Sequence, residues 1–232
     1  MQFFIDFDGT ITKQDAVDLI LEHFASCEWR KIEQAWVDGK IGSRECLTRQ
    51  IALVKVTKEE FKKLDNHIEV DPTFFSFLKT AENLGIPVTI VSDGFRIMIE
   101  QILKHASKNL KGAGRSWRIF SNQLEWHGSR VEVRFPDGPL CGHGCANCKP
   151  RVIASHRILG KKIIFVGDGL SDRFAAEAAD LTFAKGGAHG HAPLQKFCEE
   201  KHLAYKAYTN FKEIEKWVLK QSVEIKEGLT CR

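Results

Sequence analysis

The chain has 232 residues and a mass of 26.3 kDa, which is enough for one substantial hydrophobic core with a small additional unit, but not for several full domains. Its 43% hydrophobic and 28% charged residues are typical of a globular protein and exclude a disordered chain, a collagen and a disulfide-stabilised miniprotein. The 34 basic and 30 acidic side chains give a net charge of +4 and are scattered along the chain, so we expect no nucleic-acid partner.

Cysteine content and hydropathy bear on the compartment. There are seven cysteines, an odd number, three of which fall between Cys141 and Cys148, and no secretory segment is recognisable. This pattern argues against a disulfide framework and predicts a reducing, cytoplasmic environment. The longest apolar runs, such as residues 163–166, have the length of a strand and are far shorter than the roughly 20 residues of a membrane helix, so we expect no membrane partner.

Several apolar runs predict buried strands. Residues 2–8 form the first, which ends in carboxylates, and residues 87–92 and 162–167 form two more, each flanked by helical patterns. Weaker candidates are residues 181–184 and 203–206. The alternation of strands and helices predicts an α/β fold with a Rossmann-like, mainly parallel sheet, whose ligands bind beyond the carboxyl ends of the strands.

Two segments interrupt this alternation. The helical stretch after the first strand is much longer than a crossover requires, so we predict an inserted helical cap at residues 12–70 and an α/β core formed by residues 1–11 and 71–232. Trp29 and Trp36 fit one face of a cap helix, where core packing is favoured over stacking on a substrate, although a cap that faces an active site allows both. Residues 117–135 alternate between apolar and polar side chains and predict a β-hairpin with its turn at residues 127–129.

Three aspartates stand at predicted strand ends. Asp6 and Asp8 are two residues apart, and the period of a strand would aim both carboxylates to the same side. Asp168 follows another buried strand and would supply a third oxygen ligand for a hard cation such as Mg²⁺. A single such aspartate often only caps a helix or a turn, but three at strand ends favour a metal site.

Four short motifs carry a family resemblance. In chain order they are Asp6-Phe7-Asp8-Gly9-Thr10, Ser92, Lys149 and Gly167-Asp168-Gly169-Leu170-Ser171-Asp172. Together they resemble the ordered motifs of the haloacid dehalogenase superfamily. The resemblance implies a Mg²⁺-dependent phosphatase that acts on a small phosphorylated metabolite, with Asp6 as the nucleophile that forms an aspartyl-phosphate and Asp8 as the general acid and base.

The resemblance also implies roles for the other motif residues. Mg²⁺ would be held by Asp6, the backbone carbonyl of Asp8, and Asp168, and Asp172 would hold the waters of the metal. The transferring phosphoryl group would be bound by Ser92, Asp93, Gly94 and Lys149.

Features outside these motifs bear on the branch of the superfamily. The cap resembles that of phosphoserine phosphatases, and Asp15 stands nine positions after Asp6, where those enzymes carry a glutamate. Residues 141–150 and 27–29 resemble the methionine-salvage 2-hydroxy-3-keto-5-methylthiopentenyl-1-phosphate phosphatases, whereas phosphocholine and phosphoethanolamine phosphatases are similar in a looser way. We take Asp15, Arg44 and Arg49 as cap candidates for substrate contact, although the two arginines also fit a solvated helix face.

The cysteine-rich loop has two readings. Cys141, His143, Cys145 and Cys148 provide enough soft ligands for a structural Zn²⁺ site, and the alternative is a glycine-rich loop with reduced thiols. His189 and His191 are expected in a solvated loop. A regulatory module that uses the loop as a zinc-bound interaction surface is the competing class, and the motif carboxylates with Lys149 argue against it. Transfer of the phosphoryl group to an alcohol instead of water stays open, and no feature indicates an oligomeric state.

Overall fold

A computed structural model describes residues 1–64, 68–108, 118–136, 141–186 and 192–230. In these residues one seven-stranded sheet has the order β4-β3-β2-β1-β5-β6-β7. All neighbouring strands pair in parallel except β3 and β4, so the predicted α/β parallel sheet is confirmed. The strands are β1 (Gln2–Ile5), β2 (Val88–Phe95), β3 (Ile119–His127), β4 (Arg130–Arg134), β5 (Ile163–Gly167), β6 (Leu181–Lys185) and β7 (Tyr205–Tyr208).

Three predicted strands have clearly different bounds. The strand predicted at residues 87–92 continues to Phe95. The first strand ends at Ile5 instead of residue 8, because the chain turns at Asp6–Thr10, where Gly9 adopts a left-handed conformation with φ of 70°. The last strand begins at Tyr205 and not at residue 203, since the backbone turns at His202 with φ of 53°.

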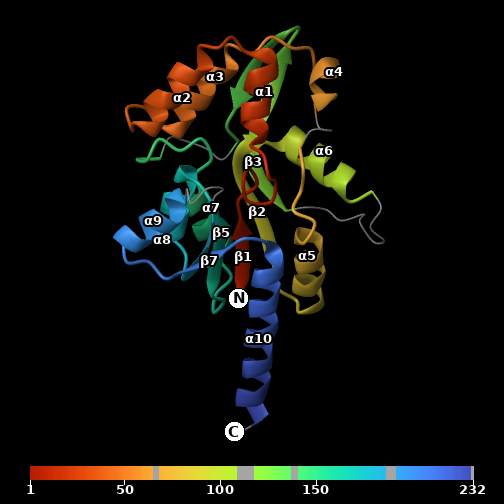
Figure 1. Ribbon diagram of the computed structural model, residues 1–232, viewed down its shortest axis with the longest axis vertical. Coiled ribbons are helices and arrows are strands. Elements are labelled where there is room, and N and C mark those ends of the chain that lie inside the picture. Colours follow the sequence, from red (N-terminus) through yellow and green to blue (C-terminus); the bar gives the residue numbers. More distant parts are fainter. Residues whose placement is uncertain (65–67, 109–117, 137–140, 187–191, 231–232) are drawn as a thin grey trace.

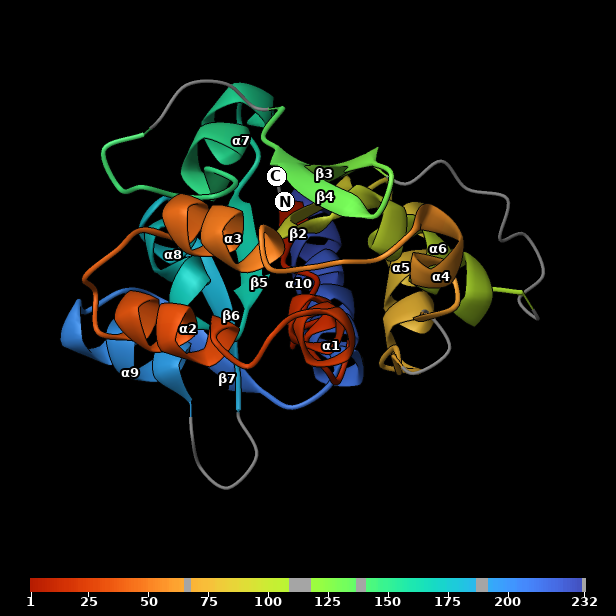
Figure 2. The ribbon, with the colours of Figure 1, turned by 90° about the horizontal axis from the view of Figure 1, so that it is seen from above.

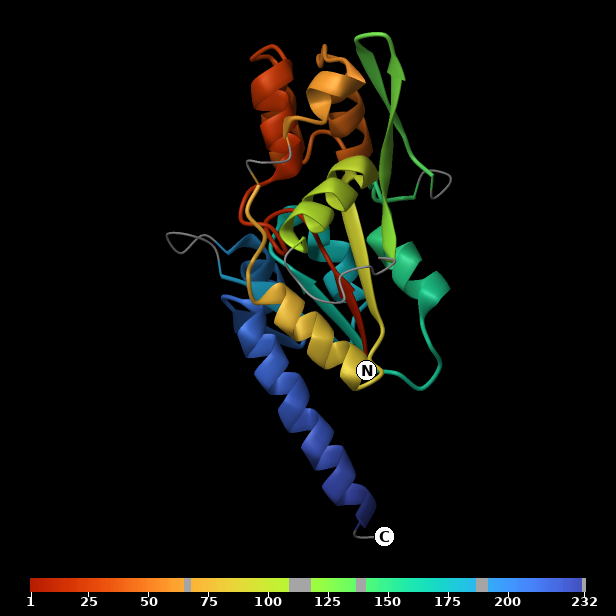
Figure 3. The same cartoon turned by 90° about the vertical axis from the view of Figure 1, so that its right-hand side faces the viewer.

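The sheet is covered on both faces, which explains the continuous apolar strands (Figure 1). Phe3 and Ile5 belong to one core with α5 (Phe74–Asn83), α6 (Arg96–Ala106) and α10 (Phe211–Thr230). Phe4 points to the other face and packs with α7 (Lys149–His156), α8 (Arg173–Glu177) and α9 (Pro193–Glu200). Beyond this core, α10 extends away from the body of the molecule (Figure 3).

Among the described residues between β1 and α5, four helices stand over the carboxyl ends of the central strands (Figures 1 and 2). They are α1 (Ala16–Phe24), α2 (Trp29–Val37), α3 (Ser43–Ile51) and α4 (Lys58–Phe61). The chain enters and leaves this group at an isolated antiparallel bridge between Thr12 and Val70. We call these helices the cap.

The predicted β-hairpin is confirmed, with Leu124 opposite Val133 and Trp126 opposite Val131. The first part of β3 extends the sheet beside β2, and its second part rises with β4 beside the cap (Figure 3). The Trp126 ring packs edge-on against Phe61 of α4 at 5.3 Å. The hairpin therefore ties the sheet to the cap.

Two further sequence expectations concern the remaining segments. Within the described ranges, none of the helices combines the length and the apolar character needed to cross a membrane. The loop that contains His189 and His191 lies outside the described residues.

Candidate active site

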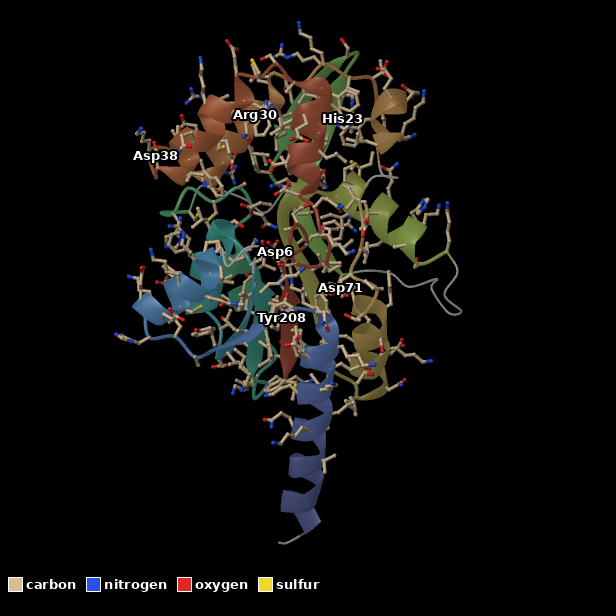
Figure 4. The ribbon with its side chains drawn as sticks, viewed as in Figure 1. Asp6, His23, Arg30, Asp38, Asp71 and Tyr208 are labelled. Carbon is tan, nitrogen blue, oxygen red and sulfur yellow. The ribbon has the colours of Figure 1, made fainter. Side chains whose placement is uncertain are left out.

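A cavity of about 170 Å³ lies where the carboxyl ends of β1, β2 and β5 meet the cap. Figure 4 shows Asp6 at this junction. Core residues on the lining are Asp6, Asp8, Asp93, Gly94, Ala146, Asp168, Gly169, Leu170 and Ser171. Cap residues on the lining are Asp15, Val17, Asp18, Glu33, Trp36, Ser43, Cys46, Leu47 and Gln50.

The turn after β1 brings the first motif to the cavity. Asp6 and Asp8 both line it, but the expectation that strand alternation aims them there is wrong, because β1 ends before Asp6. The left-handed Gly9 makes the turn, and a Cβ at this position would also strike the carboxylate of Asp168. The adjacent Thr10 donates its hydroxyl to Oδ1 of Asp168 at 2.7 Å. The first motif and Asp168 therefore pack as one unit.

The buried Lys149 links the carboxylates of Asp6 and Asp172. Lys149 is the first residue of α7 and only 1% exposed, and its Nζ lies 2.8 Å from Oδ1 of Asp6 and 2.6 Å from Oδ1 of Asp172. Burial alone would lower the pKa of Lys149, but the charges of Asp172 and Asp6 raise it, so the ammonium form is held. Burial and the charge of Asp172 raise the pKa of Asp6, and Lys149 opposes this shift.

Asp172 is fully buried and satisfies several donors. Its Oδ2 accepts hydrogen bonds from the backbone N–H groups of Asp168 at 2.9 Å and of Gly169 at 3.2 Å. Its carboxylate thus orients both Lys149 and the loop after β5. The structure gives Asp172 these direct contacts, whereas the sequence expectation was contact with metal-bound waters.

The donors of this cluster fit a divalent cation. Carboxylate oxygens of Asp6, Asp168 and Asp172 all lie within 4.8 Å of one another. Only Asp6 and Asp172 of these three contact the ammonium group of Lys149, so the cluster holds more carboxylates than the cation paired with it. Oxygen-only donors and this excess charge suit Mg²⁺.

Asp8 has a different environment from Asp6. Its Oδ1 accepts from the backbone N–H of Ala16 at 2.9 Å, and its Oδ2 lies 3.2 Å from the hydroxyl of Ser92. Burial, followed by the charge of Asp15, raises the pKa of Asp8 to about 8. The side chain is therefore largely protonated at neutral pH and able to donate a proton.

The end of β2 supplies the next group of candidates. Ser92 is fully buried behind Asp8, where its hydroxyl accepts from the N–H of Gly94 at 2.8 Å, and it does not line the cavity among the described residues. Asp93 and Gly94 do line it. Burial raises the pKa of Asp93 to about 6, and its Oδ1 accepts the N–H of Asn147 at 3.0 Å. In this arrangement Ser92 contacts Asp8 and not the cavity.

Only one of the three cap candidates is at the cavity. Asp15 lines it and caps α1, accepting from the N–H groups of Val17 at 2.7 Å and Asp18 at 3.1 Å. In the described lining, Arg44 and Arg49 are both absent. Arg44 instead donates to the carbonyl of Cys145 and stacks on the Phe135 ring, whereas Arg49 pairs with Glu45 on an exposed helix face.

The cap contributes further cavity residues that the sequence reasoning missed. Asp18 and Glu33 add two carboxylates near Asp15, and Glu33 accepts from Gln50 at 2.8 Å. Desolvation raises the pKa of Asp18 to about 7, and the charges of Asp15 and Glu33 add to this shift. Because Asp15 and Asp18 lie within one helix turn, the sequence could have predicted that their carboxylates are neighbours. No short-range sequence pattern connects Glu33 to them.

Two other residues, Trp36 and Lys185, add to the sequence expectations. Trp29 is buried as expected, whereas Trp36 lines the cavity and donates its indole N–H to Ser43. Lys185, at the end of β6, donates to the carbonyls of Gly9 at 2.7 Å and Thr10 at 2.9 Å and so braces the first motif. Lys185 could have been predicted as a site residue from its position at a strand end, as Asp168 was.

The comparisons with known proteins agree with this geometry. The sequence model of the haloacid dehalogenase-like hydrolase family matches residues 3–177. The 2-hydroxy-3-keto-5-methylthiopentenyl-1-phosphate phosphatase of Bacillus pumilus is 30% identical over 231 residues, covering 98% of this chain and 94% of that protein. The protein of the same name from Bacillus velezensis is 27% identical over 230 residues, covering 94% and 93%. A substrate-bound phosphoserine phosphatase structure has a similar fold, with a TM-score of 0.68, 20% identity and coverage of 93% of this chain and 97% of that one.

Proposed function

The chain belongs to the haloacid dehalogenase-like hydrolase family and is a phosphatase, and we propose that it hydrolyses a small phosphomonoester through an aspartyl-phosphate on Asp6. The observation that carries this mechanism is the pairing of two aspartates in different environments at one cavity. The carboxylate of Asp6 contacts the ammonium group of Lys149 and lies beside Asp168, whereas that of Asp8 accepts from the backbone N–H of Ala16 and the hydroxyl of Ser92.

The proposed reaction has two displacements. An oxygen of the ionised Asp6 attacks phosphorus, the bond from phosphorus to the ester oxygen breaks, and Asp8 gives its proton to the leaving oxygen. Asp8, now ionised, then takes a proton from water, whose oxygen attacks phosphorus and releases inorganic phosphate and free Asp6. Lys149 stabilises charge on the phosphoryl oxygens, and Ser92, which accepts the N–H of Gly94, orients Asp8.

We assign Mg²⁺ as the metal of this site. Asp6 and Asp168 would hold it, because Thr10 orients Asp168 and the charge of the cluster calls for a divalent cation. When bound, it supplies positive charge that reduces repulsion between the carboxylate of Asp6 and the phosphate dianion. Asp172 serves mainly to hold Lys149 in place.

For the substrate we propose 2-hydroxy-3-keto-5-methylthiopentenyl-1-phosphate, the compound in the names of the relatives that match nearly the whole chain. Apolar surface from Val17, Trp36 and Leu47 on the cap side of the cavity suits the methylthio chain. The carboxyl groups of Asp18 and Glu33 and the amide of Gln50 on the same side of the cavity provide hydrogen-bonding groups for the hydroxyl and keto oxygens of this substrate. A cytoplasmic location stays a prediction from the cysteine content.

A second candidate is a phosphomonoester with an ammonium group, such as phosphoserine, phosphoethanolamine or phosphocholine. Three carboxylates, those of Asp15, Asp18 and Glu33, line the cap side of the cavity. A cationic group there would keep all three ionised and pair with them.

Initial rates on a panel of phosphomonoesters with Mg²⁺ separate these candidates. The panel contains the enol phosphate named above, phosphoserine, phosphoethanolamine and phosphocholine, each with wild type and Asp15→Asn. The proposal predicts the highest kcat/KM for the enol phosphate and a similar loss on every substrate in the variant. A preference for an ammonium substrate that Asp15→Asn abolishes selectively would favour the second candidate, and release of phosphate from none of them would refute both substrates.

A further inference from the structure

A cluster of soft metal ligands lies in the loop that precedes α7, in residues to which the proposed hydrolysis gives no role. Atoms of Cys141, His143 and Cys145 able to bind a metal all lie within 4.8 Å of one another. Cys148, at the N-cap of α7, makes no capping hydrogen bond, and its thiol is a partner of the Cys141 thiol. We propose that these four side chains bind one structural Zn²⁺ ion, separate from the Mg²⁺ site.

The donor set and the spacing are those of a closed zinc site. Three sulfurs and one imidazole nitrogen make a Cys₃His set, which prefers Zn²⁺ to the hard cations that suit Asp6 and Asp168. Bond lengths of about 2.3 Å to sulfur and 2.0 Å to nitrogen in a tetrahedron place neighbouring ligand atoms roughly 3.5–3.8 Å apart. Ligand atoms of Cys141, His143 and Cys145 lie within 4.8 Å of one another, so side-chain movements bring these three to such distances, and Cys148, whose thiol is a partner of the Cys141 thiol, is the fourth ligand.

The loop backbone supports thiolates at this place. The N–H of Cys145 points at the sulfur of Cys141 at 3.4 Å, the N–H of His143 is a second donor to that sulfur, and the N–H of Arg151 is a donor to Cys148. Such N–H groups stabilise the negative charge that three metal-bound thiolates leave after one Zn²⁺ is bound.

The histidine has a fixed orientation. Its ring stacks on Phe174 of α8, with centroids 4.0 Å apart and an angle of 14° between the planes. His143 is exposed and the three cysteines are partly exposed, so a metal ion reaches the cluster from solvent. The stacking on Phe174 thus keeps the imidazole beside the thiols.

The position of the cluster gives the metal a role in the fold. The loop packs against the start of α3, where the N–H of Arg44 donates to the carbonyl of Gly144 at 3.0 Å. The fit is tight, since a Cβ on Gly42 would lie 2.7 Å from the Gly144 oxygen. In the other direction the loop leads directly to Lys149. Bound Zn²⁺ would therefore hold together the contact with the cap and the start of the helix that carries this lysine.

Zinc binding is measured on the full chain, purified in reductant without an affinity tag that binds metal and equilibrated with equimolar Zn²⁺. Elemental analysis after gel filtration is expected to give one zinc per chain, and excess Mg²⁺ should not displace it. Loading with Co²⁺ instead should produce the thiolate-to-metal charge-transfer absorption of a tetrahedral cobalt site. These two measurements need no variant.

Variants then assign the ligands. Cys145→Ser and His143→Asn should lose the zinc and weaken the cobalt spectrum, whereas Cys27→Ser, which changes an exposed free cysteine outside the loop, should keep both. A zinc chelator should lower the melting temperature of wild type and Cys27→Ser but leave that of Cys145→Ser unchanged.

Three results would overturn the proposal. One is wild-type protein that stays free of zinc after equilibration. Another is a mass two hydrogens lower with a disulfide inside the loop, which would make these thiols a redox pair. The third is equal zinc content in Cys145→Ser and wild type. None of these outcomes bears on hydrolysis by Asp6, so failure of the zinc site and failure of the proposed function are distinguishable.

Discussion

Replacing Lys149 by methionine removes the ammonium group that two buried carboxylates share but keeps most of the apolar length of the side chain. Lys149 is 1% exposed, and Asp6 and Asp172 lie within 2.8 Å of its Nζ. Removing one partner of a buried ion pair costs about 3–5 kcal/mol, because the remaining charge stays buried without compensation. For a chain of this size that loss lowers the melting temperature by roughly 6–20 °C.

The loss is measured by urea denaturation in EDTA, since urea does not screen charges as guanidinium does. Lys196→Met is the matched control, because its pair with Glu200 is long and exposed, and it should change the free energy of unfolding by no more than about 0.5 kcal/mol. The double variant Lys149→Met/Asp172→Asn should lose less free energy of unfolding than the sum of the losses in the two single variants. The expected difference is about 0.5–3 kcal/mol.

Turnover tests the same lysine independently. If Lys149 stabilises charge on the phosphoryl group, Lys149→Met should lower kcat by about 10²–10³-fold, as the loss of one donor to a developing oxyanion does. A stability loss no larger than that of Lys196→Met would refute the buried pair. Wild-type turnover in Lys149→Met would refute the role of Lys149 in phosphoryl transfer.

Three further predictions follow from the cluster. Asp6→Asn should fold with an unchanged circular dichroism spectrum but release no phosphate, and substantial activity would contradict the nucleophile. EDTA should abolish hydrolysis and Mg²⁺ should restore it, so turnover that survives chelation would remove the metal from the reaction. Gly94→Ala would place a Cβ 2.6 Å from Oδ2 of Asp8 and should lower kcat by about 10–100-fold through displacement of the acid. A wild-type kcat in Gly94→Ala would contradict the position assigned to Asp8.

Much of the fold follows from local patterns in the sequence. The runs at residues 2–5, 88–92 and 163–167 are apolar on both faces, and such strands are stable only between two helical layers. Because parallel strands end at one edge, Asp6 and Asp168 had to lie near each other once these strands were recognised. The β-hairpin could also be predicted, because its alternation of apolar and polar side chains does not depend on which element it packs against.

The contacts of the site residues could not be predicted from local sequence patterns. Ser92 lies inside β2, which continues to Phe95, and only the packed structure places its hydroxyl behind Asp8 and away from the cavity. Glu33 reaches the cavity because α2 packs on α3, where Gln50 binds its carboxylate. Nothing in the pattern of α2 marks this glutamate among its other polar residues.

The sequence by itself determined the sheet, the order of its motifs and the chemical types at the strand ends, because these depend on apolar periodicity and on the directions of parallel strands. Only the tertiary structure decided that Lys149 is shared by Asp6 and Asp172, that cap acids face Asp8, and that the cysteine loop rests on α3. The physical reason is that such contacts join residues far apart in the chain. Their geometry depends on how whole elements pack, and no short-range pattern encodes it.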